Sequence, residues 1–110
     1  MNRLEHVLTI ISEECNEVSQ RVSKSLRFGL LNVEEGQTST NMTRILDEYI
    51  DLVAMMEMLE QEIRNSNDER FKHKSLKLDK IHNGYKKRKE RKRQRVEKYF
   101  EISKKEGVLK

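Results

Sequence analysis

The stretch LEHVLTIISEECNEVSQRVSKSL, residues 4–26, carries an apolar residue at almost every third or fourth position. Because 3.6 residues make one turn of an α-helix, this spacing gathers them into one stripe along a helix. Gly29, just beyond the last of them, is a typical helix stop. The sequence therefore predicts an amphipathic helix from about residue 2 to residue 28. The stripe consists of Leu4, Val7, Leu8, Ile11, Cys15, Val18, Val22 and Leu26.

A second stripe with the same spacing predicts a helix over residues 41–64. The segment between the two helices, residues 30–40, contains Gly36 and a cluster of Thr and Ser without periodicity, so we expect a connecting loop there. Its end, TSTN at residues 38–41, supplies several residues that can cap the second helix. The second stripe consists of Ile45, Leu46, Tyr49, Leu52, Val53, Met56, Leu59 and Ile63.

The rest of the chain predicts two further helical segments. Asp68 can cap a third helix, which Gly84 would end or kink. Residues 86–103 then read as a charged helix, because eight of the ten residues from 86 to 95 are basic. The apolar residues assigned to the third helix are Phe71, Leu78, Ile81 and Tyr85, and those of the charged helix are Val96, Tyr99 and Phe100.

The composition indicates an all-α protein that does not bury a large core by itself. The 110 residues include no proline, four glycines, 35% hydrophobic and 38% charged side chains. We expect a helical bundle of long antiparallel helices completed by oligomerisation, because so few apolar groups hardly offset the entropy of ordering one chain. We divide the chain into a helical domain, residues 1–85, and a basic C-terminal helix or tail, residues 86–110.

The chain has the features of a cytoplasmic protein. No apolar run is long enough to span a membrane, and the N-terminus lacks the layout of a secretion signal. The lone cysteine, Cys15, fits a reducing compartment; we interpret it as a buried apolar residue, although it also lies between candidate metal ligands. The three histidines, His6, His73 and His82, are scattered, so no zinc site of standard spacing is visible.

Two acidic segments, EECNE at residues 13–17 and DEYID at residues 47–51, lie in the first two predicted helices. Residues three apart on a helix project side by side, so each segment presents a pair of carboxylates beside its apolar stripe. If the stripes pack together, the four carboxylates face one another and repel. A divalent cation such as Mg²⁺ resolves that conflict; the alternative is that they are solvated surface groups. The pairs are Glu14 with Glu17, and Glu48 with Asp51.

The order EExxE, then a connection, then [DE]ExxD resembles the MazG-like all-α nucleoside triphosphate pyrophosphohydrolases over about residues 4–60. The resemblance implies a helical bundle assembled as a dimer or tetramer. It also implies a requirement for Mg²⁺ or Mn²⁺, and cleavage of an NTP or dNTP to the monophosphate and pyrophosphate. The positions that match the motif would make Glu13 the residue that orients or deprotonates the attacking water. They would make Glu14, Glu17, Glu48 and Asp51 the metal ligands.

Six further residues are candidates for substrate binding, each with a plainer alternative as a surface side chain. Two cations near the end of the first helix could meet phosphate oxygens, two asparagines could contact a base or sugar, and two residues of the third helix could close over the nucleotide. These pairs are Lys24 and Arg27, Asn16 and Asn41, and Lys80 and Asn83 respectively.

The charge of the chain is divided between its two parts. Residues 1–69 hold 6 basic and 14 acidic side chains, whereas residues 70–110 hold 17 and 5. The basic run at residues 86–95 could contact a polyanion such as nucleic acid, or it could be a solvated helix that balances the acidic part. The rival to an enzyme is therefore a helical adaptor or nucleic-acid-binding protein that acts through this run.

Overall fold

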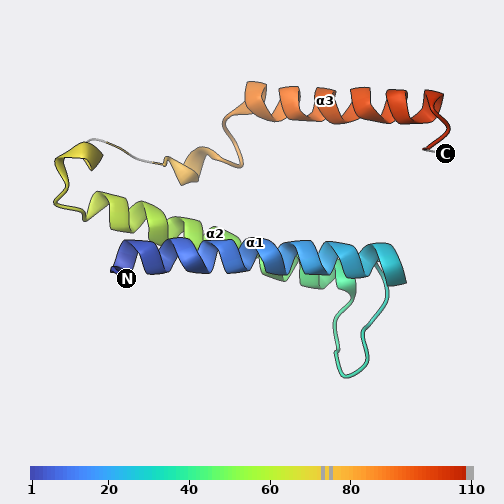
Figure 1. The fold of residues 1–110 in the computed structure, drawn as a ribbon, viewed down its shortest axis with the longest axis horizontal. Helices are drawn as coiled ribbons and strands as arrows, with labels where there is room; N and C mark the ends of the chain where they lie inside the picture. Colours follow the sequence, from blue (N-terminus) through green and yellow to red (C-terminus); the bar gives the residue numbers. More distant parts are fainter. Residues whose placement is uncertain (73, 75, 109–110) are drawn as a thin grey trace. The chain divides into compact units, whose positions relative to one another are not determined.

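A computed structural model describes residues 1–72, 74 and 76–108, and this part of the chain is helical, as predicted (Figure 1). Its β-structure is one isolated bridge between Val33 and Thr40. No helix of the described residues is long and apolar enough to cross a membrane. The chain forms two compact units, Met1–Leu76 and Lys77–Lys110. The helices are α1 (Arg3–Phe28), α2 (Asn41–Arg64) and α3 (Lys86–Lys105), with 3₁₀ turns η1 (Glu69–Phe71) and η2 (Leu78–Lys80).

The ends of α1 and α2 are fixed by local hydrogen bonds, and both predicted helices are confirmed. At the start of α1, Asn2 and Glu5 form a reciprocal capping box, which satisfies backbone groups that have no partner inside the helix. At its end Gly29 has φ +96°, a conformation that favours glycine, and its N–H donates to the Ser25 carbonyl oxygen at 2.8 Å. Thr40 caps α2 by accepting from the Thr43 N–H at 3.2 Å.

Helices α1 and α2 lie side by side and run in opposite directions (Figure 1). Arg3 at the start of α1 pairs with Glu62 near the end of α2. At the other end of the pair, the Asn41 side chain donates to the Gly29 carbonyl oxygen at 3.0 Å. The two helices therefore form an antiparallel hairpin, whose loop comprises residues 29–40.

The shielded face of α1 changes in character along the helix. Positions 4, 7, 11, 14, 18, 21 and 25, alternately three and four residues apart, are at least half-buried. The first three are Leu4, Val7 and Ile11, whereas positions 14 and 21 are Glu14 and Arg21. The half of the hairpin that contains the start of α1 and the end of α2 is thus held by apolar contacts. The half near the loop contains charged groups in the seam between the helices.

The hairpin leaves much of its apolar surface uncovered. Among the described residues Val7 is the one fully buried hydrophobic side chain, at 2% exposure, while Leu26 is 84% exposed. The interpretation of Cys15 as buried is wrong, because this residue is exposed. The reason is that within the first unit α1 has one neighbouring helix, α2, and the row formed by Leu8, Cys15 and Val22 lies beside the seam between these two helices.

The predicted third helix is also wrong. In its place the described residues between Asp68 and Tyr85 form the turns η1 and η2, and Lys77 and Tyr85 adopt the left-handed conformation, which an α-helix does not contain. The apolar spacing is broken between Phe71 and Leu78, so a helix here would have no continuous stripe to bury. Asp68 does act as a cap, but of η1, where it accepts from the Arg70 N–H at 2.9 Å. His73, one of the three scattered histidines whose spacing gives no zinc site, lies outside the described residues.

The charged helix is confirmed as α3, which begins at Lys86 and ends at Lys105. Gly84 lies in the turn that precedes it. A Cβ at this position would come within 2.6 Å of the Lys80 carbonyl oxygen, so the turn excludes a larger residue. None of the α3 residues is buried, which leaves its basic side chains on the surface of the second unit.

Asn41 provides a test of how the hairpin is closed. The side chain is 1% exposed, and its amide nitrogen satisfies the Gly29 carbonyl oxygen. Asn41→Ala leaves that oxygen without its partner and should lower the free energy of unfolding by about 2 kcal/mol. Asn16→Ala, at an exposed position of α1, should change it by less than about 0.5 kcal/mol. Urea unfolding followed by circular dichroism measures both, and equal effects would show that Asn41 does not close the hairpin.

Candidate metal centre

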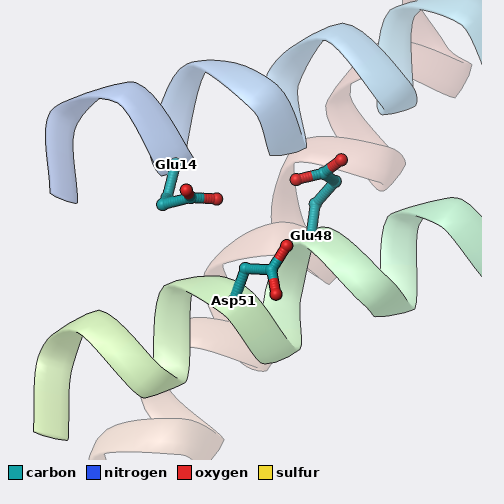
Figure 2. A group of neighbouring side chains, drawn as sticks. All are labelled: Glu14, Glu48 and Asp51. Atoms are coloured by element: carbon teal, nitrogen blue, oxygen red, sulfur yellow. The ribbon is translucent and has the colours of Figure 1, made fainter. Parts of the chain in front are cut away.

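Three carboxylates meet across the seam of the hairpin. Glu14 projects from α1, and Glu48 and Asp51 project from α2, where their spacing of three residues places them on one face. One oxygen atom from each lies within 4.8 Å of those of the other two. Figure 2 shows the three side chains directed into the space between the two helices. The structure thus brings together three of the four carboxylates that the sequence proposed as ligands.

Glu14 carries the electrostatic cost of this arrangement. Its pKa is raised above 4.5, first because it is partly withdrawn from water and then because Asp51 and Glu48 face it; Glu17 and Glu13 add smaller repulsions. Its Oε2 atom is buried and has no hydrogen-bond partner among the described residues. An ionised Glu14 is therefore an unsatisfied negative charge, for which a bound cation would be a partner.

The donor set fits a hard divalent cation. Mg²⁺ and Mn²⁺ prefer carboxylate oxygens, and Mg²⁺ is usually held by one or two protein carboxylates with water or substrate oxygens at its other positions. In an octahedron with metal–oxygen distances of about 2.1 Å, ligand oxygens lie about 3 to 4 Å apart. The grouping of Glu14, Glu48 and Asp51 within 4.8 Å needs little contraction to reach that spacing.

The other two acidic candidates lie beside this group. Glu17 is half-buried and close enough to raise the pKa of Glu14, but it is not one of the three whose oxygens come together. Glu13 is exposed on α1 and also contributes to the shift of Glu14. Both therefore contribute to the negative field of the centre, and the ligand role of Glu17 and the water-activating role of Glu13 stay predictions.

The residues predicted to bind substrate are placed in different surroundings. Lys24 lies in an ion pair with a loop carboxylate, and the Arg27 guanidinium stacks over the Phe28 ring at 5.0 Å. Asn16 is exposed, whereas Asn41 is buried and engaged with the loop. Their contacts with phosphate, base or sugar stay predictions. So do those of Lys80 and Asn83, which belong to the second unit.

On the loop side of the carboxylates lies a group of basic residues, of which the sequence identified only Lys24. We call Arg21, Lys24 and Arg44 the cation cluster. All three bind the carboxylate of Glu34, a residue of the loop: Arg21 Nη1 at 3.3 Å, Lys24 Nζ at 2.9 Å and Arg44 Nη1 at 2.6 Å. Hydrogen bonds from Lys24 and Arg44 lower the pKa of Glu34 to about 2, so this carboxylate is ionised at neutral pH.

Two members of the cation cluster could have been found from spacing. Arg21 follows Glu17 by four residues and Arg44 precedes Glu48 by four, so each continues the face of its helix that carries the acidic pair. Glu34 gives no such signal, because it lies in a loop without periodicity. Its position depends on the bridge between Val33 and Thr40 and on the turn that begins at Glu34 itself.

The resemblance to MazG-like pyrophosphohydrolases depends on the acidic motif within residues 13–51. Comparison of the chain with family models, with curated proteins and with solved structures finds no match in any of the three. What the structure adds to the motif is proximity: the second carboxylate of one segment faces two carboxylates of the other.

The raised pKa of Glu14 gives a pH-dependent prediction for the metal-free protein. The folded state holds the Glu14 proton more tightly than the unfolded state, so stability falls as pH rises from about 4.5 through the raised pKa of the folded protein. In chelator, Glu14→Gln should therefore be more resistant to urea than the wild type at pH 7, and this advantage should disappear below pH 4.5.

Glu57→Gln is the matched control, since Glu57 is an exposed glutamate of α2 outside the centre. Its unfolding midpoint should follow that of the wild type at every pH. A Glu14→Gln protein that is less stable than the wild type at pH 7 would contradict the repulsion at the centre.

Proposed function

We propose that this chain is a Mg²⁺-dependent nucleoside triphosphate pyrophosphohydrolase, which cleaves an NTP or dNTP to the monophosphate and pyrophosphate. The observation that carries the proposal is the meeting of Glu14, Glu48 and Asp51 across the seam, with a buried and unpaired oxygen on Glu14. Helix pairs normally fill such positions with apolar residues, so acidic groups here suit a purpose other than stability.

The roles of the residues follow from their positions. The three carboxylates would hold Mg²⁺, or Mn²⁺ in its place, and the bound ion supplies charge neutralisation for the phosphate oxygens. Glu17 stands beside them as a further ligand. Glu13 would accept a proton from the attacking water, which adds to a phosphorus of the α–β anhydride while that anhydride bond breaks. Lys24, within the cation cluster, would stabilise the negative charge on the phosphates.

Self-association belongs to the same proposal. The hairpin buries Val7 alone among the hydrophobic side chains of the described residues, whereas Leu26, Leu46 and Ile50 are more than half exposed. Apolar surface on both helices favours burial against another copy of the chain. We therefore infer a helical bundle assembled from hairpins of two or four chains.

A second candidate is a helical adaptor that binds nucleic acid through α3. The observation that favours it is that the cations at positions 88, 91, 95 and 98 line one surface of this helix, at spacings of three and four residues. Such a row would bind phosphates with steep dependence on salt. Aromatic residues do not interrupt the basic run at 86–95, so stacking on bases has no support there.

Turnover distinguishes the two candidates. Purified protein incubated with Mg²⁺ and a panel of NTPs and dNTPs should release pyrophosphate from at least one of them. Glu48→Ala and Asp51→Ala should each reduce this release at least a hundredfold and weaken Mn²⁺ binding, because each removes a proposed ligand. Both should retain the helical circular dichroism signal. Pyrophosphate release and calorimetric titration with Mn²⁺ measure the two effects.

Glu57→Ala is the control, since it removes an exposed carboxylate of the same helix. Its activity should equal that of the wild type. Full activity in both Glu48→Ala and Asp51→Ala would refute the metal centre. No release from any nucleotide, together with tight and salt-sensitive binding of DNA or RNA, would favour the adaptor.

Assembly is tested by sedimentation. The uncovered apolar side chains of α1 and α2 should produce a dimer or tetramer in analytical ultracentrifugation at micromolar concentration. Replacement of Leu26 and Leu46 by Lys should shift the distribution towards the monomer. A compact, thermally stable monomer of the wild type would contradict the inference.

A further inference from the structure

The cation cluster is not balanced by the carboxylate that it binds. Within the described residues, the ion pairs of Arg21, Lys24 and Arg44 are all made with Glu34, so three positive charges share one negative charge. Two of the cations are also largely withdrawn from water: the side chain of Arg21 is 11% exposed and that of Arg44 is 16% exposed. Buried charge without a full counter-charge is costly, which suits this place to a ligand with more than one negative charge.

Arg21 also has too few hydrogen-bond acceptors among the described residues. Its Nη1 makes a long hydrogen bond of 3.3 Å to Glu34, and its Nε atom is buried without a hydrogen-bond partner among the described residues. A guanidinium can donate along two parallel directions to one phosphate. Here it donates to a carboxylate that already bonds Lys24 and Arg44. Arg21 therefore has an unused donor that a larger oxyanion could accept.

The cation cluster adjoins the metal centre. Arg21 lies seven residues beyond Glu14 on α1, and Arg44 lies four residues before Glu48 on α2. These separations correspond to a rise of about 10 Å along α1 and of about 6 Å along α2. Because the helices are antiparallel, both arginines lie on the loop side of the carboxylates. The cations therefore lie one to two helical turns from the carboxylates, on the side towards which the phosphate chain of a metal-bound nucleotide can extend.

We propose that the cation cluster is the subsite for the phosphate groups of the substrate, and that Glu34 occupies this subsite until those phosphates displace it. The identity of the ligand rests on the proposed function, but the cluster can be tested without metal or turnover. Glu34 lies in the loop between the two helices, at the start of a turn. Glu34 begins a turn in which the Gln37 N–H donates to its carbonyl oxygen at 2.9 Å, and Gly36 has φ +82°.

The base of the loop is held independently of Glu34. The Asn41 N–H donates to the Asn32 carbonyl oxygen, and the Met42 N–H donates to that of Leu30, both at 2.9 Å. Glu34 follows the bridged residue Val33, so it lies nearer the tip of the loop than these two hydrogen bonds. Release of Glu34 therefore breaks its three side-chain ion pairs without opening the end of the hairpin.

Binding of inorganic pyrophosphate to the 110-residue chain in the presence of a chelator tests this proposal. If Glu34 occupies the cluster most of the time, Glu34→Gln should bind pyrophosphate at least about tenfold more tightly than the wild type, since the competing anion is gone. Arg44→Gln should weaken binding by about tenfold or more, because it removes a charge-assisted donor. The matched controls are Glu35→Gln, at the neighbouring exposed carboxylate, and Arg64→Gln, at the far end of α2. Both should bind as the wild type does.

Equal affinities of Glu34→Gln and Glu35→Gln would overturn the displacement, and unchanged affinity in Arg44→Gln would overturn the subsite. The wild type supplies a measurement that does not depend on the folding of any variant. Pyrophosphate should shift the backbone amide signals of residues 33–37 in NMR spectra, because Glu34 leaves the cluster. Unshifted signals at saturating pyrophosphate would overturn the displacement. If no nucleotide is turned over but pyrophosphate binds as expected, the proposed function is refuted and the phosphate subsite stays supported.

Discussion

The proposed metal centre depends on the repulsion between Glu14 and the two carboxylates that face it from α2. The shielded face of α1 holds apolar residues nearer the start of the helix, but at position 14 it holds a carboxylate. The pKa of this carboxylate is raised, and its Oε2 atom has no hydrogen-bond partner among the described residues. Such a group opposes the packing of the two helices when it is ionised. The hairpin tolerates it because Leu4, Val7 and Ile11 hold the helices together at the start of α1. At the loop, the Asn41 side chain joins the two helices through its hydrogen bond to the Gly29 carbonyl oxygen. The strain at the centre is therefore local.

Two charged groups of opposite sign lie next to each other in the same half of the hairpin. The carboxylates repel one another, and among the described residues the three cations of the cluster share the carboxylate of Glu34. In the proposed function a magnesium nucleotide satisfies both at once, with the ion at the carboxylates and the phosphates at the cluster. Glu34 fills part of the second site in the protein alone. The hairpin also leaves apolar surface that a further copy of the chain would cover, so catalysis and assembly would use different faces of α1 and α2.

Periodicity predicted the parts of the fold that follow from one helix and its neighbour. It gave α1, α2 and α3, because their stripes or charge are continuous, and it placed Glu14, Glu48 and Asp51 on facing sides of two helices. It failed at residues 68–85, where the apolar spacing is interrupted, and at Cys15, whose burial depends on how many helices surround α1. Periodicity could not identify Glu34, since the ion pairs of a loop residue depend on a turn that has no repeating pattern.

The most direct test is a crystal structure of the protein soaked with Mn²⁺, in which anomalous scattering locates the ion. We expect a peak between α1 and α2 that is coordinated by oxygens of Glu14, Glu48 and Asp51, at distances of about 2.2 Å. Peaks confined to other surface carboxylates, with these three side chains turned apart, would contradict it.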